Sequence, residues 1–159
     1  LLLNYGDHQM DDGLTLLQYF FNELDDVEFS NNIFYEILEL VKSEIQSHGK
    51  MDLRRMLDTV SGEARKEMIN LLSERYEISN LWMDKFQIYV PTEKDILSNV
   101  AHSNLLRLKY RLIKNLISQN REELREANAE EQHKLLQVDC ELKKSRTELA
   151  KQLGIIVSD

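Results

Sequence analysis

The residues of this sequence that could carry out chemistry are few, and their surroundings favour no catalytic site. The single cysteine, Cys140, lies between Asp139 and Glu141, whose charges oppose the electropositive setting that a reactive thiolate needs. The five glycines are isolated from one another, so the chain has no glycine-rich loop for a phosphate. We therefore predict that this chain is not an enzyme. One cysteine also cannot form an internal disulfide, which favours a reducing compartment, the cytoplasm.

Residues that could bind a metal are equally sparse. Glu130 and His133 form an E-x-x-H pair, but a di-iron bundle needs two such pairs and two further glutamates. Glu44 and His48 are four residues apart, and an imidazole in the last turn of a helix is explained by the helix dipole alone. Two pairs of adjacent aspartates flank a predicted helix and are expected to be solvated, at 11–12 and 25–26. The sequence predicts no metal site and no cofactor.

Charge is spread unevenly along the chain, whose net charge is −8. Residues 1–46 carry ten acidic residues and one basic residue, whereas residues 91–159 carry eleven acidic and twelve basic residues. The acidic first third would repel a phosphate backbone, so direct nucleic-acid binding by the whole domain is disfavoured.

Two groups of basic residues lie in the C-terminal part. Arg107, Arg111 and Lys114 follow one another at steps of four and three, which places them on one helix face. That face could meet phosphates or an acidic partner, or it could be an ordinary solvated face. A second group lies among leucines and could steer an acidic partner surface: Lys143, Lys144, Arg146 and Lys151.

The elements that position these residues are all predicted to be helices. Glycine and proline together number six of 159 residues, and leucine alone numbers 26. This composition excludes a turn-rich β fold and favours an all-α fold. No apolar run is long enough to span a bilayer, so we expect no membrane association. The chain starts in the middle of a helical pattern, and we expect it to be a fragment of a longer protein.

The first 91 residues are predicted to form a compact bundle of short helices. Apolar residues recur at helical spacing, Asn31 and Asp52 can cap helix starts, and Gly6 and Gly49 can end helices. The predicted helices span 1–6, 14–26, 31–49, 51–60, 62–76 and 78–86.

The only proline, Pro91, marks the boundary between two predicted subdomains, 1–91 and 92–159. Thr92 can form a capping box with Asp95, and a long helix should follow from Glu93 to about Asn120.

A polar stretch at 120–128 should reverse the chain into a second long helix. Asn128 is a good cap for this helix, 129–153, which ends at Gly154. Five of its residues fall on a heptad track with a polar break at Ser145: Leu135, Val138, Leu142, Leu149 and Gln152. We thus predict a long antiparallel helical hairpin over 92–153. The apolar tail after Gly154 could fold back on the hairpin or enter a groove of a partner.

Four stretches of the chain together resemble the C-terminal region of bacterial replicative DNA primases. They are LLLNYG at 1–6, NELDDVEFSNNIFYEIL at 22–38, LSERYEIS at 72–79 and KQLGIIV at 151–157. The stretches occur in the family's order with similar spacing, and they extend from end to end. None of them is a catalytic motif.

The resemblance implies a helical domain that lacks the zinc-binding module and the polymerase core of the full-length primase. In that family the domain binds the N-terminal region of the hexameric replicative DNA helicase and couples primer synthesis to the replication fork. The hairpin and the extreme C-terminus make much of the contact, which here corresponds to about 129–159. We therefore expect partner-binding residues at Leu135, Leu142, Lys143, Lys144, Arg146, Leu149, Lys151, Gln152, Ile155 and Ile156.

Two alternatives stay open. The chain could be a helical adaptor that binds single-stranded nucleic acid through Arg107, Arg111 and Lys114. Such binding usually adds aromatic platforms for the bases, and only Tyr110 lies nearby. The relative could also be the helicase itself, because its N-terminal region resembles the primase domain in fold, although the four stretches favour the primase.

Overall fold

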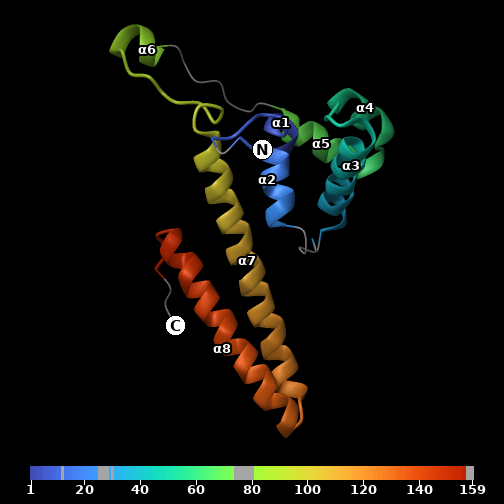
Figure 1. Ribbon diagram of the computed structural model, residues 1–159, viewed down its shortest axis with the longest axis vertical. Helices are drawn as coiled ribbons and strands as arrows, with labels where there is room; N and C mark the ends of the chain where they lie inside the picture. The colour runs from blue at the N-terminus through green and yellow to red at the C-terminus, as the bar shows by residue number, and fades with distance from the viewer. Residues whose placement is uncertain (12, 25–28, 30, 74–80, 157–159) are drawn as a thin grey trace. The chain divides into compact units, whose positions relative to one another are not determined.

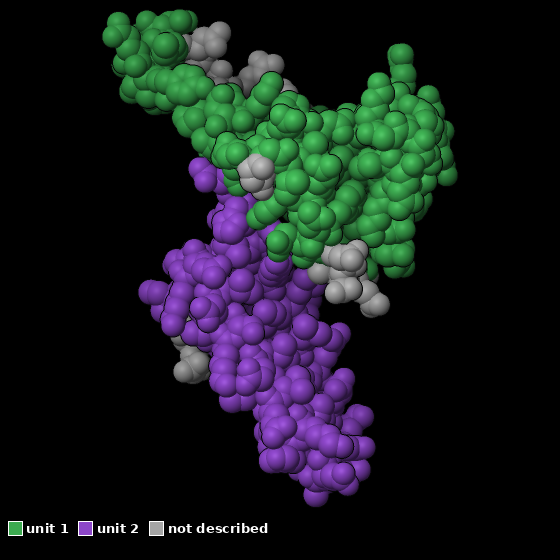
Figure 2. Space-filling view, in the orientation of Figure 1, with its two compact units in different colours: residues 1–98 green, residues 99–159 purple. Residues whose placement is uncertain are grey.

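The computed structural model describes residues 1–11, 13–24, 29, 31–73 and 81–156. Over these residues the chain forms eight helices and no strand, and one isolated antiparallel bridge joins Gln9 to Thr15. The predicted all-α fold is confirmed. The structure divides into two compact units, residues 1–98 and residues 99–159 (Figure 2).

The first unit is built from six short helices and the start of a seventh (Figure 1). The predicted helices in this part are present, although parts of three of them lie outside the described residues, at 25–26, 74–76 and 78–80. The helices are α1 (Leu2–Tyr5), α2 (Leu16–Glu23), α3 (Asn32–His48), α4 (Leu53–Thr59), α5 (Gly62–Leu72) and α6 (Leu81–Phe86).

Side-chain caps fix the ends of these helices as the sequence predicts. The Asn31 side chain accepts hydrogen bonds from the backbone N–H groups of Ile33 and Phe34 at the start of α3. Asp52 caps α4 in the same way. At the end of α3, Gly49 adopts the left-handed conformation with a φ of 70°.

The core of the first unit lies between α1, α2, α3, α4 and α5. The core is apolar, and its centre is shielded from solvent, since Val41, Met56 and Met68 are at most 1 % exposed. Interiors packed at this density leave little room for an added methyl group.

Gly6 serves this core by its size rather than by its conformation. The sequence predicts a glycine that ends a helix in the left-handed region, but Gly6 has a right-handed helical φ of −52°. A β-carbon at this position would lie 2.6 Å from the Leu2 carbonyl oxygen and 2.8 Å from Leu17 Cδ1. Only a hydrogen atom fits between α1 and α2 at this point.

The boundary region differs from the prediction by one helical turn. The predicted pair forms, since the Asp95 carboxylate accepts hydrogen bonds from the Thr92 N–H and hydroxyl, each at 2.7 Å. The Tyr89 hydroxyl also donates to Asp95, at 2.6 Å. These bonds close a turn, and α7 starts only at Leu97 rather than at Glu93.

The first residues of α7 belong to the first unit. Leu97 is buried, and the Asp11 N–H donates a hydrogen bond to the Ser98 hydroxyl. The division of the structure therefore falls after residue 98, and the predicted boundary after residue 91 lies within the first unit.

The second unit contains the hairpin of α7 (Leu97–Glu126) and α8 (Ala129–Gln152), which run antiparallel (Figure 1). Helix α7 continues beyond the predicted end at Asn120, because residues 121–126 favour helix and Arg125 forms an ion pair with Glu122. The reversal is thereby confined to residues 127–128. The predicted capping box of Asn128 with Glu131 starts α8.

One side-chain hydrogen bond joins the two arms of the hairpin. Asn120 is 5 % exposed, and its amide nitrogen donates to the Leu135 carbonyl oxygen across 3.1 Å. Because the donor lies on α7 and the acceptor on α8, this bond favours one register of the two helices over its neighbours.

Replacing Gly6 with alanine is expected to destabilise the protein by about 1–3 kcal/mol, because the new methyl group overpacks the contact of α1 with α2. Urea denaturation measures the change in the free energy of unfolding. The comparison is Gly49→Ala, whose β-carbon would meet no atom within 4 Å and whose cost of about 1–2 kcal/mol comes from the left-handed backbone alone. A Gly6→Ala protein as stable as the wild type would contradict the close packing.

The Asp95 cluster should be visible in a pH titration. The hydrogen bond from Tyr89 is the main cause that lowers the pKa of Asp95, and the same bond raises the pKa of Tyr89. The stabilisation by the carboxylate is thus complete above the ordinary carboxyl pKa and is lost as pH falls through the lowered pKa. In Asp95→Asn, we expect the pKa of Tyr89 to return toward 10, as measured by ultraviolet absorption, with Tyr89→Phe to assign the signal. An unchanged tyrosine titration would refute this bond.

Replacing Asn120 with alanine is expected to lower the free energy of unfolding by about 0.5–1.5 kcal/mol, the usual contribution of one hydrogen bond. Asn115→Ala is the matched control, because Asn115 lies on the same helix, is exposed, and gains the same helix propensity. Equal stabilities of the two variants would show that the bond to Leu135 contributes nothing.

Candidate functional site

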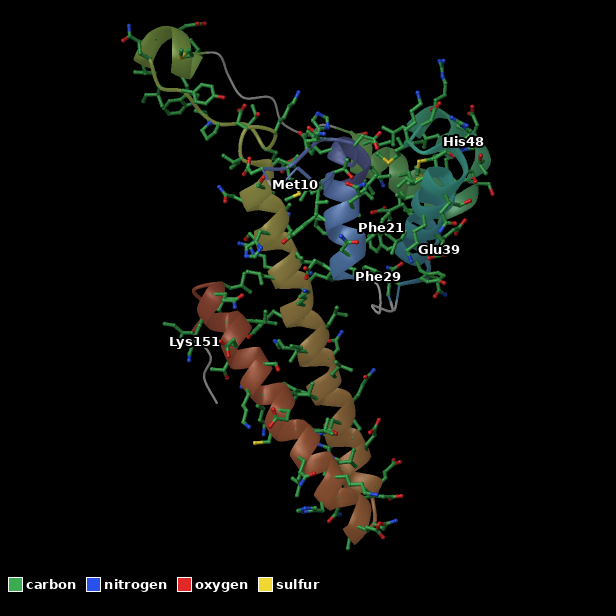
Figure 3. The ribbon with its side chains drawn as sticks, viewed as in Figure 1. Met10, Phe21, Phe29, Glu39, His48 and Lys151 are labelled. Atoms are coloured by element: carbon green, nitrogen blue, oxygen red, sulfur yellow. The ribbon has the colours of Figure 1, made fainter. Side chains whose placement is uncertain are left out.

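The residues predicted to bind a partner through α8 fall into two sets. The first set is partly buried, so only the exposed parts of its side chains could touch a partner: Leu135, Leu142, Lys143, Arg146 and Leu149. Lys144, Lys151, Gln152 and the two isoleucines of the tail are exposed. Figure 3 shows Lys151 extending away from the last turn of α8.

The inward face of α8 differs from the predicted heptad track. Val138 is 47 % exposed, and Ser145 and Gln152 are also exposed. A row of shielded residues instead follows alternating steps of four and three: Leu135, Asp139, Leu142, Arg146, Leu149 and Leu153. This row keeps a seven-residue repeat, but the residues that follow Val138, Ser145 and Gln152 are shielded in their place. The face of α8 that remains free for a partner is therefore rotated from the predicted one.

The basic residues of α8 are largely neutralised within their own helix. Lys143 forms an ion pair with Asp139, which is only 8 % exposed. Lys144 donates to Glu141 at 2.7 Å, and this hydrogen bond raises the pKa of Lys144. Since charge reversal at Lys143 would leave a buried carboxylate without its partner, it would test the hairpin rather than an interface.

Helix α8 ends in a backbone capping motif, and an exposed apolar tail follows it. Gly154 has a φ of 66°, its N–H donates to Lys151, and the Ile155 N–H donates to Ala150. This pattern is the Schellman motif, which satisfies the last carbonyl groups of a helix. Ile155 is 41 % exposed and Ile156 is 95 % exposed. Ile156 does not fold back onto the hairpin; Val157 lies outside the described residues.

The basic face of α7 forms as the spacing predicts. Arg107, Arg111 and Lys114 are all exposed, and none forms an ion pair with another described residue. Arg121 lies on the same side, two turns after Lys114, and is also exposed without such a pair. Arg121 was not predicted as part of this face, although a step of seven residues returns to the same side of a helix.

Residues 81–90 form a second apolar surface that the sequence reading missed. Seven large apolar side chains of this segment are between 37 % and 64 % exposed: Leu81, Trp82, Met83, Phe86, Ile88, Tyr89 and Val90. The rings of Trp82 and Phe86 lie 5.8 Å apart, so they shield each other only in part. The sequence alone could have indicated this surface, because seven large apolar residues among ten cannot all lie on the one face that a short helix buries.

A buried carboxylate in the first unit was also missed. Glu44 is 7 % exposed, and its oxygens lie 3.1 Å from Arg55 Nε and 3.5 Å from His48 Nδ1. Figure 3 shows His48 at the end of α3. The pair joins α3 to the start of α4, which explains Glu44 and His48 without a metal ion.

The remaining chemical candidates stay apart in the structure. Cys140 is exposed and forms no disulfide. Glu130 forms an ion pair with Lys134, and His133 contacts Gln137. Among the described residues, no three histidine, cysteine, aspartate or glutamate side chains are arranged to hold a metal ion. No described helix has both the length and the apolar character required to cross a membrane.

Comparison with known proteins places the chain in a family. No curated protein and no solved structure matches it significantly. One family model matches residues 1–157, which is nearly the whole chain. The chain therefore belongs to the family described as a domain of unknown function, DUF8430.

Proposed function

We propose that this chain is a non-catalytic protein-interaction domain of a cytoplasmic DNA primase, and that it binds the N-terminal region of a hexameric replicative DNA helicase. The helicase is suggested by the resemblance of four stretches to the primase C-terminal region. The enzymatic activity of such a parent protein would reside outside this chain.

The observation that carries the proposal is the exposed apolar end of α8. Ile156 is 95 % exposed, although the helix before it ends in a Schellman motif in which the Leu149, Ala150 and Lys151 carbonyl oxygens accept hydrogen bonds. Fully burying such a side chain contributes about 1.5–3 kcal/mol, so an interface that covers it gains a useful share of its affinity. The exposed apolar segment at 81–90 adds a second surface of the kind that protein interfaces cover.

Lys151 lies in the last turn of α8, close to this apolar end in the sequence, and is exposed. Basic residues at the edge of an apolar contact speed the encounter with an acidic partner and add little to its final affinity. We therefore expect the tail to set the affinity for the helicase and Lys151 to contribute to the salt dependence of association.

Replacing Ile156 with aspartate is expected to weaken binding of the helicase by about tenfold or more, which corresponds to about 1.4 kcal/mol. The tail follows the last helix, so the circular dichroism spectrum should not change. Binding is measured by surface plasmon resonance with the cognate helicase hexamer immobilised.

The matched control is Ile69→Asp, since Ile69 is 48 % exposed on α5 and lies outside the proposed interface. Its affinity should equal that of the wild type within a factor of two. A wild-type domain that fails to bind the helicase, or an Ile156→Asp domain that binds as tightly as the wild type, would overturn the proposal.

A further inference from the structure

The central part of the chain contains a long stretch without any acidic residue. Between Asp95 and Glu122 there are no aspartates or glutamates, but there are five basic residues: Arg107, Lys109, Arg111, Lys114 and Arg121. All five lie on α7. Because helix ion pairs form between residues three or four apart, α7 cannot neutralise these charges within itself as α8 does.

Four of these residues form a continuous stripe on one side of α7, which we call the cationic stripe: Arg107, Arg111, Lys114 and Arg121. Steps of four, three and seven residues keep them on the same helix face over about 21 Å. All four are exposed, and none pairs with another described residue. The inward residues Ile117 and Asn120 are buried on a different side of the helix, so the stripe points away from the contact with α8.

This arrangement is unfavourable in the isolated domain. Like charges four residues apart on a helix destabilise it by about 0.2–0.5 kcal/mol per pair. A bound surface with regularly spaced negative charges would remove that repulsion and form several ion pairs at once. The stripe therefore suits an anionic ligand that is extended and straight and whose charges follow the stripe's intervals of about 6, 4.5 and 10.5 Å along α7.

We propose that the cationic stripe is a second docking surface, distinct from the end of α8, and that its ligand is an acidic helix of a partner protein. An acidic helix with carboxylates at steps of four and three residues matches the stripe in length and spacing. A nucleic-acid strand fits less well, because single-strand binding relies on exposed aromatic platforms, and the nearby Tyr110 is partly buried.

The test uses the whole domain and two fluorescent probes, so it does not depend on the helicase. One probe is an alanine-based helical peptide with glutamates at alternating steps of four and three residues. The other is a single-stranded oligodeoxynucleotide of the same net charge. Fluorescence anisotropy at low ionic strength should show tighter binding of the peptide. The triple variant Arg107→Glu, Arg111→Glu, Lys114→Glu should bind the peptide at least tenfold more weakly.

The control is the variant Lys50→Glu, Lys66→Glu, Lys134→Glu, which has the same net charge but leaves the stripe intact. Its affinity for the peptide should stay within a factor of two of the wild type. Tighter binding of the oligonucleotide, no binding of the peptide, or equal losses in both triple variants would overturn the proposal. Circular dichroism establishes that both variants keep their helix content.

Discussion

The hydrogen bond between Asn120 and the Leu135 carbonyl is the constraint on which the surface of the second unit depends. It lies close to the two-residue reversal at 127–128, where small changes of register would move every residue of α8. A buried polar group that is satisfied in only one register opposes the alternatives, because they would leave it without a partner. With that register fixed, α8 shields one row of side chains, which follows alternating steps of four and three residues from Leu135 to Leu153.

The distribution of charge on the hairpin follows from this arrangement. Asp139 lies on the shielded side of α8 and forms an ion pair with Lys143. The exposed Lys144 forms an ion pair with Glu141. The basic residues of α8 are thus mostly compensated, although the sequence places them among leucines where a partner would be expected. On α7, no acidic residue lies three or four residues from any member of the cationic stripe, so the stripe is not compensated within its own helix. Two basic groups that look alike in the sequence therefore differ in the charge they present to solvent.

The fold could be predicted from local signals because caps and helical periodicity act over a few residues. Asn31, Asp52 and Asn128 start their helices as expected. The predicted start of α7 was wrong by four residues, because the Thr92–Asp95 pair closes a turn instead of capping a helix directly. The shielded face of α8 and the role of Gly6 could not be predicted, because both depend on contacts between helices. The burial of Glu44 could not be predicted for the same reason, because its partner Arg55 lies on another helix.

The two proposed docking surfaces would contribute to binding in different ways, and this difference makes them separable. An apolar tail such as Ile155–Ile156 gains affinity from area removed from water, which salt scarcely weakens. A cationic stripe gains from charge pairing, which falls steeply as salt rises, since charges farther apart than about 8 Å are screened at physiological ionic strength. Loss of the tail should therefore appear mainly in the dissociation rate, and loss of the stripe mainly in the association rate at low salt. A partner that used both surfaces would be captured by the stripe and retained by the tail.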